Sequence, residues 1–395
     1  MRVRRDIAVA AIAALVVGLS VTPRVLGAVG ALPHDLVLFG WSDVLATWND
    51  SRLPGHKIPY LDVPFAYPPL VGYVAGAISL LSGGFLAYAL LWGVVIAAAA
   101  GAGAYLFARQ AGHRRTLVYW ACAPQLLLLS GINFDVLAAV LLGAAAIAAR
   151  RRHDLRAGAL LALGTAAKLF PAVSAPVHVW RIAASGDRRR AAAAAVAFAA
   201  VLAVLYLPAV LAPFSAARFI GAYAVGVTAN IDSPWVIVEG LLNAAGLDGH
   251  VAVLAVTYAG FGLSYLLLVL PRTRAVSDPA VGFGLATVTL LLWTRLYSPQ
   301  YSLWVLPFFV LLPLRVKSFV LLAIADIGVF FTIYPLTLVL DRSDPLQGVL
   351  LPLLFASVAL RVVALIVIWR DIAGSAKRTT IATATVPVGG LRGLM

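Results

Sequence analysis

Residues 191–214 read AAAAAVAFAAVLAVLYLPAVLAPF, a run without a charged side chain. A helix needs about 20 consecutive apolar residues to cross the hydrocarbon core of a bilayer. Of the 395 residues, 62% are hydrophobic and only 12% are charged, whereas roughly a quarter are charged in a soluble domain. The sequence therefore predicts an all-α, polytopic bundle of transmembrane helices and excludes a soluble domain. Similar apolar runs occur at residues 7–28, 85–108, 251–270, 319–340 and 349–369.

Basic residues are grouped in short polar breaks between the apolar runs. Lys and Arg are enriched in cytoplasmic loops, so the net charge of +14 reflects membrane topology and is not a nucleic-acid footprint. Counting the apolar segments gives about 12 or 13 spans, with both termini in the cytoplasm. The basic clusters lie at residues 2–5, 109–115, 150–156, 181–190, 272–274, 315–317 and 370–392.

The sequence of residues 68–115 does not decide how many times this segment crosses the membrane. A short apolar segment at 68–81, a Gly83-Gly84 turn and a full span would put the basic cluster at 109–115 outside the cell. Either the short segment is re-entrant or this cluster is an exception to the charge rule. The first apolar run is too long for the core of a signal peptide, and we interpret it as the first span.

The breaks on the other face carry most of the acidic residues, and this face is expected to be exterior. Two exterior segments are long, about 30–67 and 215–250, and long loops usually carry function. The first is expected to hold an interfacial helix through residues 36–48. Residues 1–370 form the predicted membrane domain, and residues 371–395 a disordered cytoplasmic tail. The exterior acids are Asp35, Asp43, Asp50, Asp62, Asp135, Asp232, Glu239, Asp248, Asp341 and Asp344.

Two acids of the first exterior loop are candidates for acid–base chemistry. Asp35 follows His34 after the first span, and Asp43 comes eight residues later. A carboxylate in such a loop can take a proton from a sugar hydroxyl as a general base. The alternative is a solvated acid or a helix N-cap. No metal or cofactor is expected, because Cys122 is the only cysteine and the exterior acids form no compact ligand spacing.

Lys168 is a candidate ligand for a lipid phosphate. It interrupts the apolar run 160–173, and a cation inside a membrane needs a partner or must snorkel to the interface. Its partner is expected to be a lipid phosphate or Asp135. Asn133 and Asp135 follow a span on the exterior side, and their alternative role is to cap the next helix.

Arg295 is a second candidate phosphate ligand, because its planar guanidinium offers several donors to phosphate oxygens. It lies in Trp293-Thr-Arg-Leu-Tyr-Ser-Pro-Gln-Tyr301, which an aromatic interface belt would also explain. Asp326 and Arg361 fall inside late spans, and we interpret them as an internal structural pair. The other candidates for substrate binding are His34, Tyr67, Asp232, Ser233, Ser298, Gln300 and Tyr301.

In their order along residues 1–370, these motifs resemble the GT-C superfamily of polyprenyl-phosphate-sugar-dependent glycosyltransferases. They are similar to the bacterial branch that includes the actinobacterial polyprenyl-phosphate-mannose-dependent α-mannosyltransferases, which often has Glu where Asp232 stands. The matching pieces are Asp35 with Phe39, Pro59-Tyr60, Tyr67-Pro-Pro-Leu70, Asn133-Phe-Asp135, Ala157-Gly158, Lys168-Leu-Phe-Pro171, Ile231-Asp-Ser233 and Ser298-Pro-Gln-Tyr301 with Trp304 and Pro307.

The resemblance implies a membrane glycosyltransferase. It would move a sugar, expected to be mannose, from a polyprenyl-phosphate donor to a lipid or glycan acceptor at the outer face, with inversion. Asp35 matches the first-loop acid that acts as general base in the family, and Asp43 remains the alternative. Lys168 and Arg295 would hold the leaving phosphate, because stabilising developing charge is usually the largest catalytic effect.

Two other classes of protein remain as alternatives. A flippase for lipid-linked saccharides, or another transporter, predicts charges along a central path and internal repeats. Here Lys168, Asp326 and Arg361 are the deep charges, and the acids crowd one face. A non-catalytic membrane scaffold would have little use for long acidic loops on one side.

Overall fold

The computed structural model describes residues 2–33, 36, 39–274, 276–339 and 345–384. Within these ranges the chain is helical and has no β-strand, only an isolated bridge between Pro59 and Val63. The α-helices are α1 (Arg2–Ala28), α2 (Asp43–Asp50), α3 (Pro69–Leu81), α4 (Phe85–Ala111), α5 (His113–Thr116), α6 (Pro124–Leu129), α7 (Asp135–Arg150), α8 (Asp154–Ala167), α9 (Ser174–Ala184), α10 (Arg188–Leu211), α11 (Ala216–Gly226), α12 (Trp235–Ala244), α13 (Gly249–Ser264), α14 (Leu270–Arg274), α15 (Pro279–Trp293), α16 (Leu306–Leu311), α17 (Val316–Val339) and α18 (Gln347–Ala384). Short 3₁₀ or π segments are η2 (Leu117–Ala121), η3 (Phe170–Val173), η4 (Tyr265–Val269) and η5 (Pro299–Val305).

Six helices in the described ranges are long and apolar enough to cross a membrane. Their most apolar windows have mean hydropathies of 2.0 to 2.6, and only 11% of the window in α10 is buried inside the protein. Exposed side chains such as Leu207 and Leu211 would face water in a soluble protein but face lipid tails in a bilayer. The predicted all-α, polytopic membrane bundle is therefore confirmed. The six are α1, α4, α10, the continuous helix Gly249–Arg274, α17 and α18.

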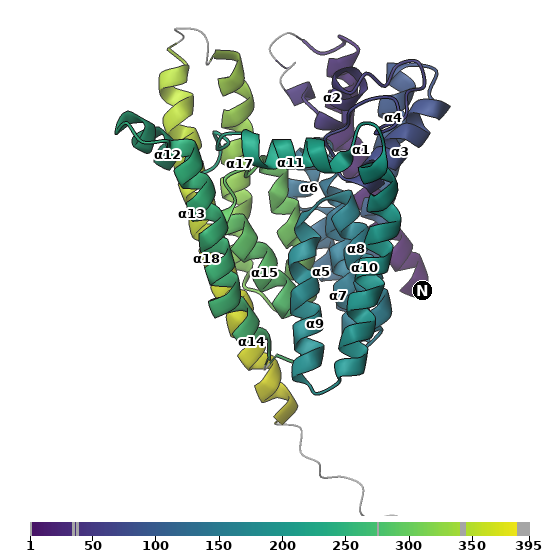
Figure 1. Ribbon diagram of the computed structural model, residues 1–395, viewed down its shortest axis with the longest axis vertical. Coiled ribbons are helices and arrows are strands. Elements are labelled where there is room, and N and C mark those ends of the chain that lie inside the picture. Colours follow the sequence, from purple (N-terminus) through teal and green to yellow (C-terminus); the bar gives the residue numbers. More distant parts are fainter. Residues whose placement is uncertain (1, 34–35, 37–38, 275, 340–344, 385–395) are drawn as a thin grey trace, which may run out of the picture.

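The basic clusters gather at one end of the bundle, the lower end in Figure 1. Arg115 donates to the carbonyl of Val310 at 2.9 Å, and Arg150 donates to that of Leu311 at 2.9 Å. Arg150 also pairs with Asp278 at 2.6 Å. We call this the basic end; its assignment to the cytoplasm stays a prediction. Further ion pairs at the helix termini are Asp6–His113, Asp154–Arg190 and Arg315–Asp371.

Two interrupted segments also pass between the ends. The first leaves the basic end at Arg115 and reaches Gly131, whose amide donates to Ser20 Oγ in the far half of α1. The second runs from Ser298 through η5 and α16 to Leu312, back at the basic end. With interrupted passes counted, the course agrees with the expected count of about 12 spans. The passes are α1, α4, α5 to α6, α7, α8, η3 to α9, α10, α13 to α14, α15, η5 to α16, α17 and α18.

Helix α3 begins and ends against the same loop, so it does not cross. Near its start, Gly72 packs against the ring of the loop residue Tyr60, which a Cβ added at Gly72 would meet. Near its end, Ser79 Oγ donates to the carbonyl of Leu53 at 3.1 Å. The segment is re-entrant, the first of the two alternatives, and α4 carries Arg109 to the basic end.

Both long loops lie at the end opposite the basic end. In the first, a helix is expected from residue 36, but the α-helix α2 starts only at Asp43, where the carbonyl of Ile132 accepts the amide of Asp43 at 2.8 Å. Leu36, Phe39 and Gly40 are in a 3₁₀ conformation, and the extended Ser42 separates them from α2. In the second, α11 lies across the long helices and α12 follows it (Figure 1). Helix α18 continues past residue 371 to Ala384, and disorder of the remaining tail stays a prediction.

Candidate functional site

A cavity of about 390 Å³ opens between the two long loops and α17. Asp43, Asp232, Ser298 and Gln300 line it, and the sequence had singled out all four. Trp41, Asn230 and Tyr334 also line it and were not among the candidates. The rest of the lining is apolar: Ile132, Ile231, Pro299 and Ile333, with the methyl-bearing Thr337. A concave, mostly apolar pocket with a few convergent polar groups is the usual form of a ligand site.

Hydrogen bonds from Asn133 and Trp41 hold Asp43 at the cavity. Its Oδ2 accepts a hydrogen bond from Asn133 Nδ2 at 2.7 Å, and its Oδ1 accepts one from the Trp41 indole at 3.2 Å. Burial raises the pKa of this carboxyl above its ordinary value, while nearby Lys168 and the two hydrogen bonds act in the opposite direction. A carboxylate with a raised pKa is a stronger base than an exposed aspartate.

Lys168 lies in a cage of rings and one carboxylate. Its Nζ is 3.4 Å from Asp135 Oδ2, and it sits 5.7 Å from the ring centre of Tyr67 and 5.5 Å from that of Tyr301. Asp135 is fully buried and accepts a second bond from the Trp304 indole at 2.6 Å. Of the two partners expected for Lys168, the structure supplies Asp135.

The local sequence explains why Lys168 reaches this cage. Helix α8 ends at Ala167, and Lys168 itself is extended, with φ −158° and ψ 139°. Pro171, three residues on, has no N–H to offer to the helix and its ring clashes with a helical continuation. The break turns the lysine out of the helix, and its side chain is only 13% exposed. Because Asn133 and Asp135 are two residues apart, the Asp43 and Lys168 clusters are neighbours.

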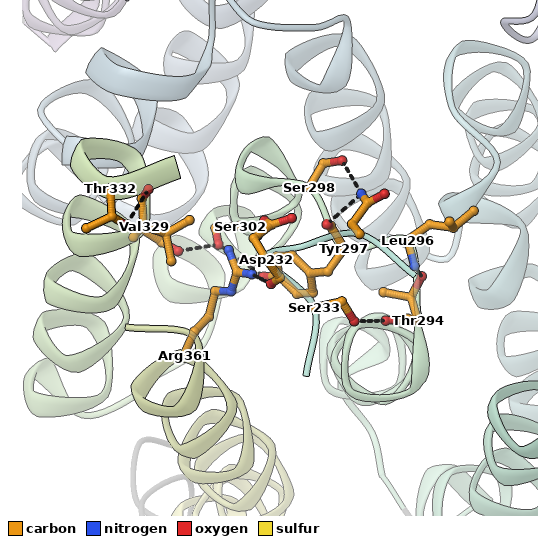
Figure 2. Close-up of polar contacts among 12 residues, drawn as sticks. Asp232, Ser233, Thr294, Leu296, Tyr297, Ser298, Ser302, Val329, Thr332 and Arg361 are labelled. Atoms are coloured by element: carbon orange, nitrogen blue, oxygen red, sulfur yellow. Dashed lines mark hydrogen bonds and ion pairs between the residues drawn. The ribbon is translucent and has the colours of Figure 1, made fainter. Parts of the chain in front are cut away.

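One wall of the cavity is built by two loop stretches that hydrogen bonds join to each other, as Figure 2 shows in part. Asn230 donates through Nδ2 to the carbonyl of Tyr297 at 2.8 Å and to Ser298 Oγ at 3.0 Å. Ser233 Oγ donates to the carbonyl of Thr294 at 3.4 Å. Burial raises the pKa of the Asp232 carboxyl, against the effect of nearby Arg361.

Arg295 faces away from the cavity lining and towards the end of α11. Its guanidinium donates to the carbonyl of Ala224 at 2.6 Å and to that of Val227, and its side chain is 4% exposed. These carbonyls have no partner inside the helix at its C-terminus, so Arg295 caps α11. Its role as a phosphate ligand stays a prediction. His34 and Asp35 lie outside the described residues.

The acidic partner of Arg361 is Asp232, at 3.2 Å. The expected structural pair of Asp326 and Arg361 is therefore not a direct one: Asp326 instead accepts hydrogen bonds from Ser302 at 2.7 Å and Gln125 at 3.0 Å. The sequence shows Arg361 as a charge inside a span, but no local pattern connects it to an acid more than a hundred residues away. In the described ranges, no three His, Cys, Asp or Glu side chains form a group that could hold a metal ion.

Comparison with known proteins identifies the family. The model of glycosyltransferase family 87 matches residues 65–299, more than half of the chain. This match includes Tyr67, Asn133, Asp135, Lys168 and Asp232, and it excludes Asp43 and Arg361. No curated protein and no solved structure matches the chain. The chain therefore belongs to glycosyltransferase family 87 and is a membrane glycosyltransferase.

Proposed function

We propose that the protein transfers a sugar from a polyprenyl phosphate to a hydroxyl group of an acceptor bound in the cavity beside Asp43. The observation that carries the proposal is the placement of a carboxylate of raised pKa next to a caged lysine. A base and a cation are the two groups that this reaction needs. Mannose as the sugar, and a glycolipid or glycan as the acceptor, follow from the resemblance to the actinobacterial branch.

The transfer is a single displacement. The acceptor oxygen attacks the anomeric carbon, a new C–O bond forms there, and its proton moves to an aspartate carboxylate. The bond from the anomeric carbon to the phosphate oxygen breaks, and polyprenyl phosphate leaves with the electron pair. Attack from the face opposite the leaving group inverts the configuration. Lys168 stabilises the charge that develops on the phosphate.

Two acids of the first loop are alternatives for the base. Asp35 is favoured by the family resemblance, and Asp43 by its position at the cavity and its raised pKa. The proposal places the reaction at the exterior face, because the basic clusters lie at the other end of the bundle and basic loops stay in the cytoplasm.

The test uses the purified full chain in lipid nanodiscs with radiolabelled mannosyl polyprenyl phosphate and a panel of glycolipid acceptors. We expect acceptor-dependent transfer that is lost in either Asp35→Asn or Asp43→Asn. Asp50→Asn is the matched control, since Asp50 is exposed and ends the same helix that Asp43 begins. Transfer that survives in both loop variants would show that neither acid is the base. Transfer from a nucleotide sugar but not from the lipid donor would contradict the proposed donor class.

A further inference from the structure

The cavity wall formed by residues 230–232 and 298–300 is in contact with a residue of the last helix. Asn230 and Asp232 belong to one loop, residues 227–234, and Ser298 and Gln300 to the stretch 294–301. No β-strand joins these stretches in the described ranges, and a few hydrogen bonds hold them together. Arg361 of α18 reaches both, as the sticks in Figure 2 show.

Arg361 makes two different contacts with these stretches. Its Nη2 donates to the Asp232 carbonyl and lies 3.2 Å from Asp232 Oδ2. The guanidinium carbon Cζ of Arg361 lies over the ring of Tyr297, 3.9 Å from its centre. The side chains of both Arg361 and Asp232 are only 2% exposed, so each buried charge has the other as its partner.

A second layer of hydrogen bonds fixes Tyr297 beneath the guanidinium. The Tyr297 hydroxyl lies 3.1 Å from Ser302 Oγ, which donates to Asp326 at 2.7 Å. One buried acid, Asp232, therefore contacts the guanidinium directly, and a second, Asp326, is linked to the ring of Tyr297 through Ser302. Arg361 itself does not line the cavity.

A deeply buried ion pair is not the most stabilising way to join two loops. Well-packed apolar side chains of similar volume often give equal or greater stability than a buried ion pair. What the pair does provide is a defined direction for a carboxylate at the cavity surface.

We infer that Arg361 is a positioning residue: it holds Asp232 and the Asn230–Ser298 edge in the geometry that binds the acceptor. The inference rests on the proposed function, in which the cavity receives the acceptor. It adds to the site a residue of α18, outside the segment that the family model matches. Lys168, the proposed ligand of the leaving phosphate, belongs to the cluster with Asp135 and not to this wall. Binding of the donor should therefore not depend on Arg361.

The experiment compares Arg361→Met, Arg361→Lys, Asp232→Asn and the double variant Asp232→Asn/Arg361→Met in nanodiscs. The KM for acceptor and the KM for donor are measured separately, beside thermal unfolding. Arg150→Met is the matched control, because it breaks an ion pair of 2.6 Å at the basic end.

We expect the single variants to lose stability and the double variant to regain most of it, since no unpaired charge is left buried. In Arg361→Met and in the double variant, the KM for acceptor should rise by about 10- to 100-fold, as expected for a lost hydrogen bond to a charged group. Arg361→Lys should recover part of the loss. Arg150→Met should change stability alone.

Two results would overturn the inference. One is a double variant with the acceptor KM of the unsubstituted protein, because the pair would then be only structural. The other is an equal rise in both KM values. Failure of the proposed function is distinct from either, since it shows in the unsubstituted protein as no transfer from the lipid donor.

Discussion

Asn133 donates a hydrogen bond of 2.7 Å to the carboxylate of Asp43, although the two residues lie on different segments. Asn133 precedes α7 and Asp43 opens α2, so this bond ties the first long loop to the core of the bundle. The same bond favours the ionised carboxylate, because a donor stabilises the charged form of an acid. It therefore lowers a pKa that burial has raised.

Removal of Asn133 should shift the pH profile of transfer. A base must be deprotonated, so kcat/KM rises with pH through the pKa of the free enzyme. Asn133→Ala removes an effect that lowers the pKa of Asp43, so that pKa rises further. The acid limb should move to higher pH. Asn49→Ala, an exposed change in the same helix as Asp43, should leave the profile in place. An unmoved limb in Asn133→Ala would exclude Asp43 as the base and leave Asp35.

Lys168 should affect both stability and the use of donor. Lys168→Met leaves the fully buried Asp135 carboxylate without its cation, and breaking a buried pair costs about 3–5 kcal/mol. Asp135→Asn/Lys168→Met should restore much of the stability, as judged by thermal unfolding in detergent. It should not restore transfer, because the leaving phosphate still lacks its cation, and kcat should stay lower by about 100-fold or more. Full activity in the double variant would remove Lys168 from the mechanism.

Arg295 can be tested as a helix cap and as a phosphate ligand in one experiment. Arg295→Met removes the donors to the carbonyls of Ala224 and Val227, so the end of α11 should loosen. Cys122 is the only cysteine, so Tyr223→Cys in a Cys122→Ser background gives one labelling site on α11. We expect faster thiol labelling in Arg295→Met. A raised KM for donor with unchanged labelling would instead support the phosphate role and count against the cap.

The apolar runs were sufficient to predict the bundle. Each long run became a helix, because a backbone in lipid must satisfy its hydrogen bonds internally. The interrupted passes were harder to predict. Residues 117–129 and 299–311 contain π or 3₁₀ turns and prolines, and short broken helices of this kind have no distinct periodicity. Whether α3 crosses is decided only by the contacts of Ser79 and Gly72 with the first loop.

Residues of the candidate site could be predicted where a charged or polar side chain interrupts an apolar segment. Lys168 stands out as a cation in an apolar run, and Asp135 is one of the two partners expected for it; the structure places the two 3.4 Å apart. Tyr334 lines the cavity, yet a tyrosine near the end of a span looks the same as an interface anchor. The pairing of Arg361 with Asp232 depends on how α18 packs, and no sequence pattern carries that information.

Close packing of α8 against α10 should make Gly158 sensitive to substitution. A Cβ at this position would lie well inside van der Waals contact of the Ala194 carbonyl oxygen, a backbone atom that cannot rotate away. The two helices would have to separate, and overpacking of this kind costs about 1–3 kcal/mol. Because Lys168 directly follows the end of α8, displacement of this helix should also reduce transfer. Gly18→Ala is the matched control, since a Cβ there would meet no atom within 4 Å. We expect a lower midpoint of thermal unfolding and weaker transfer for Gly158→Ala, and neither change for Gly18→Ala. Equal unfolding midpoints for the two variants would mean that α8 and α10 do not pack as closely as described.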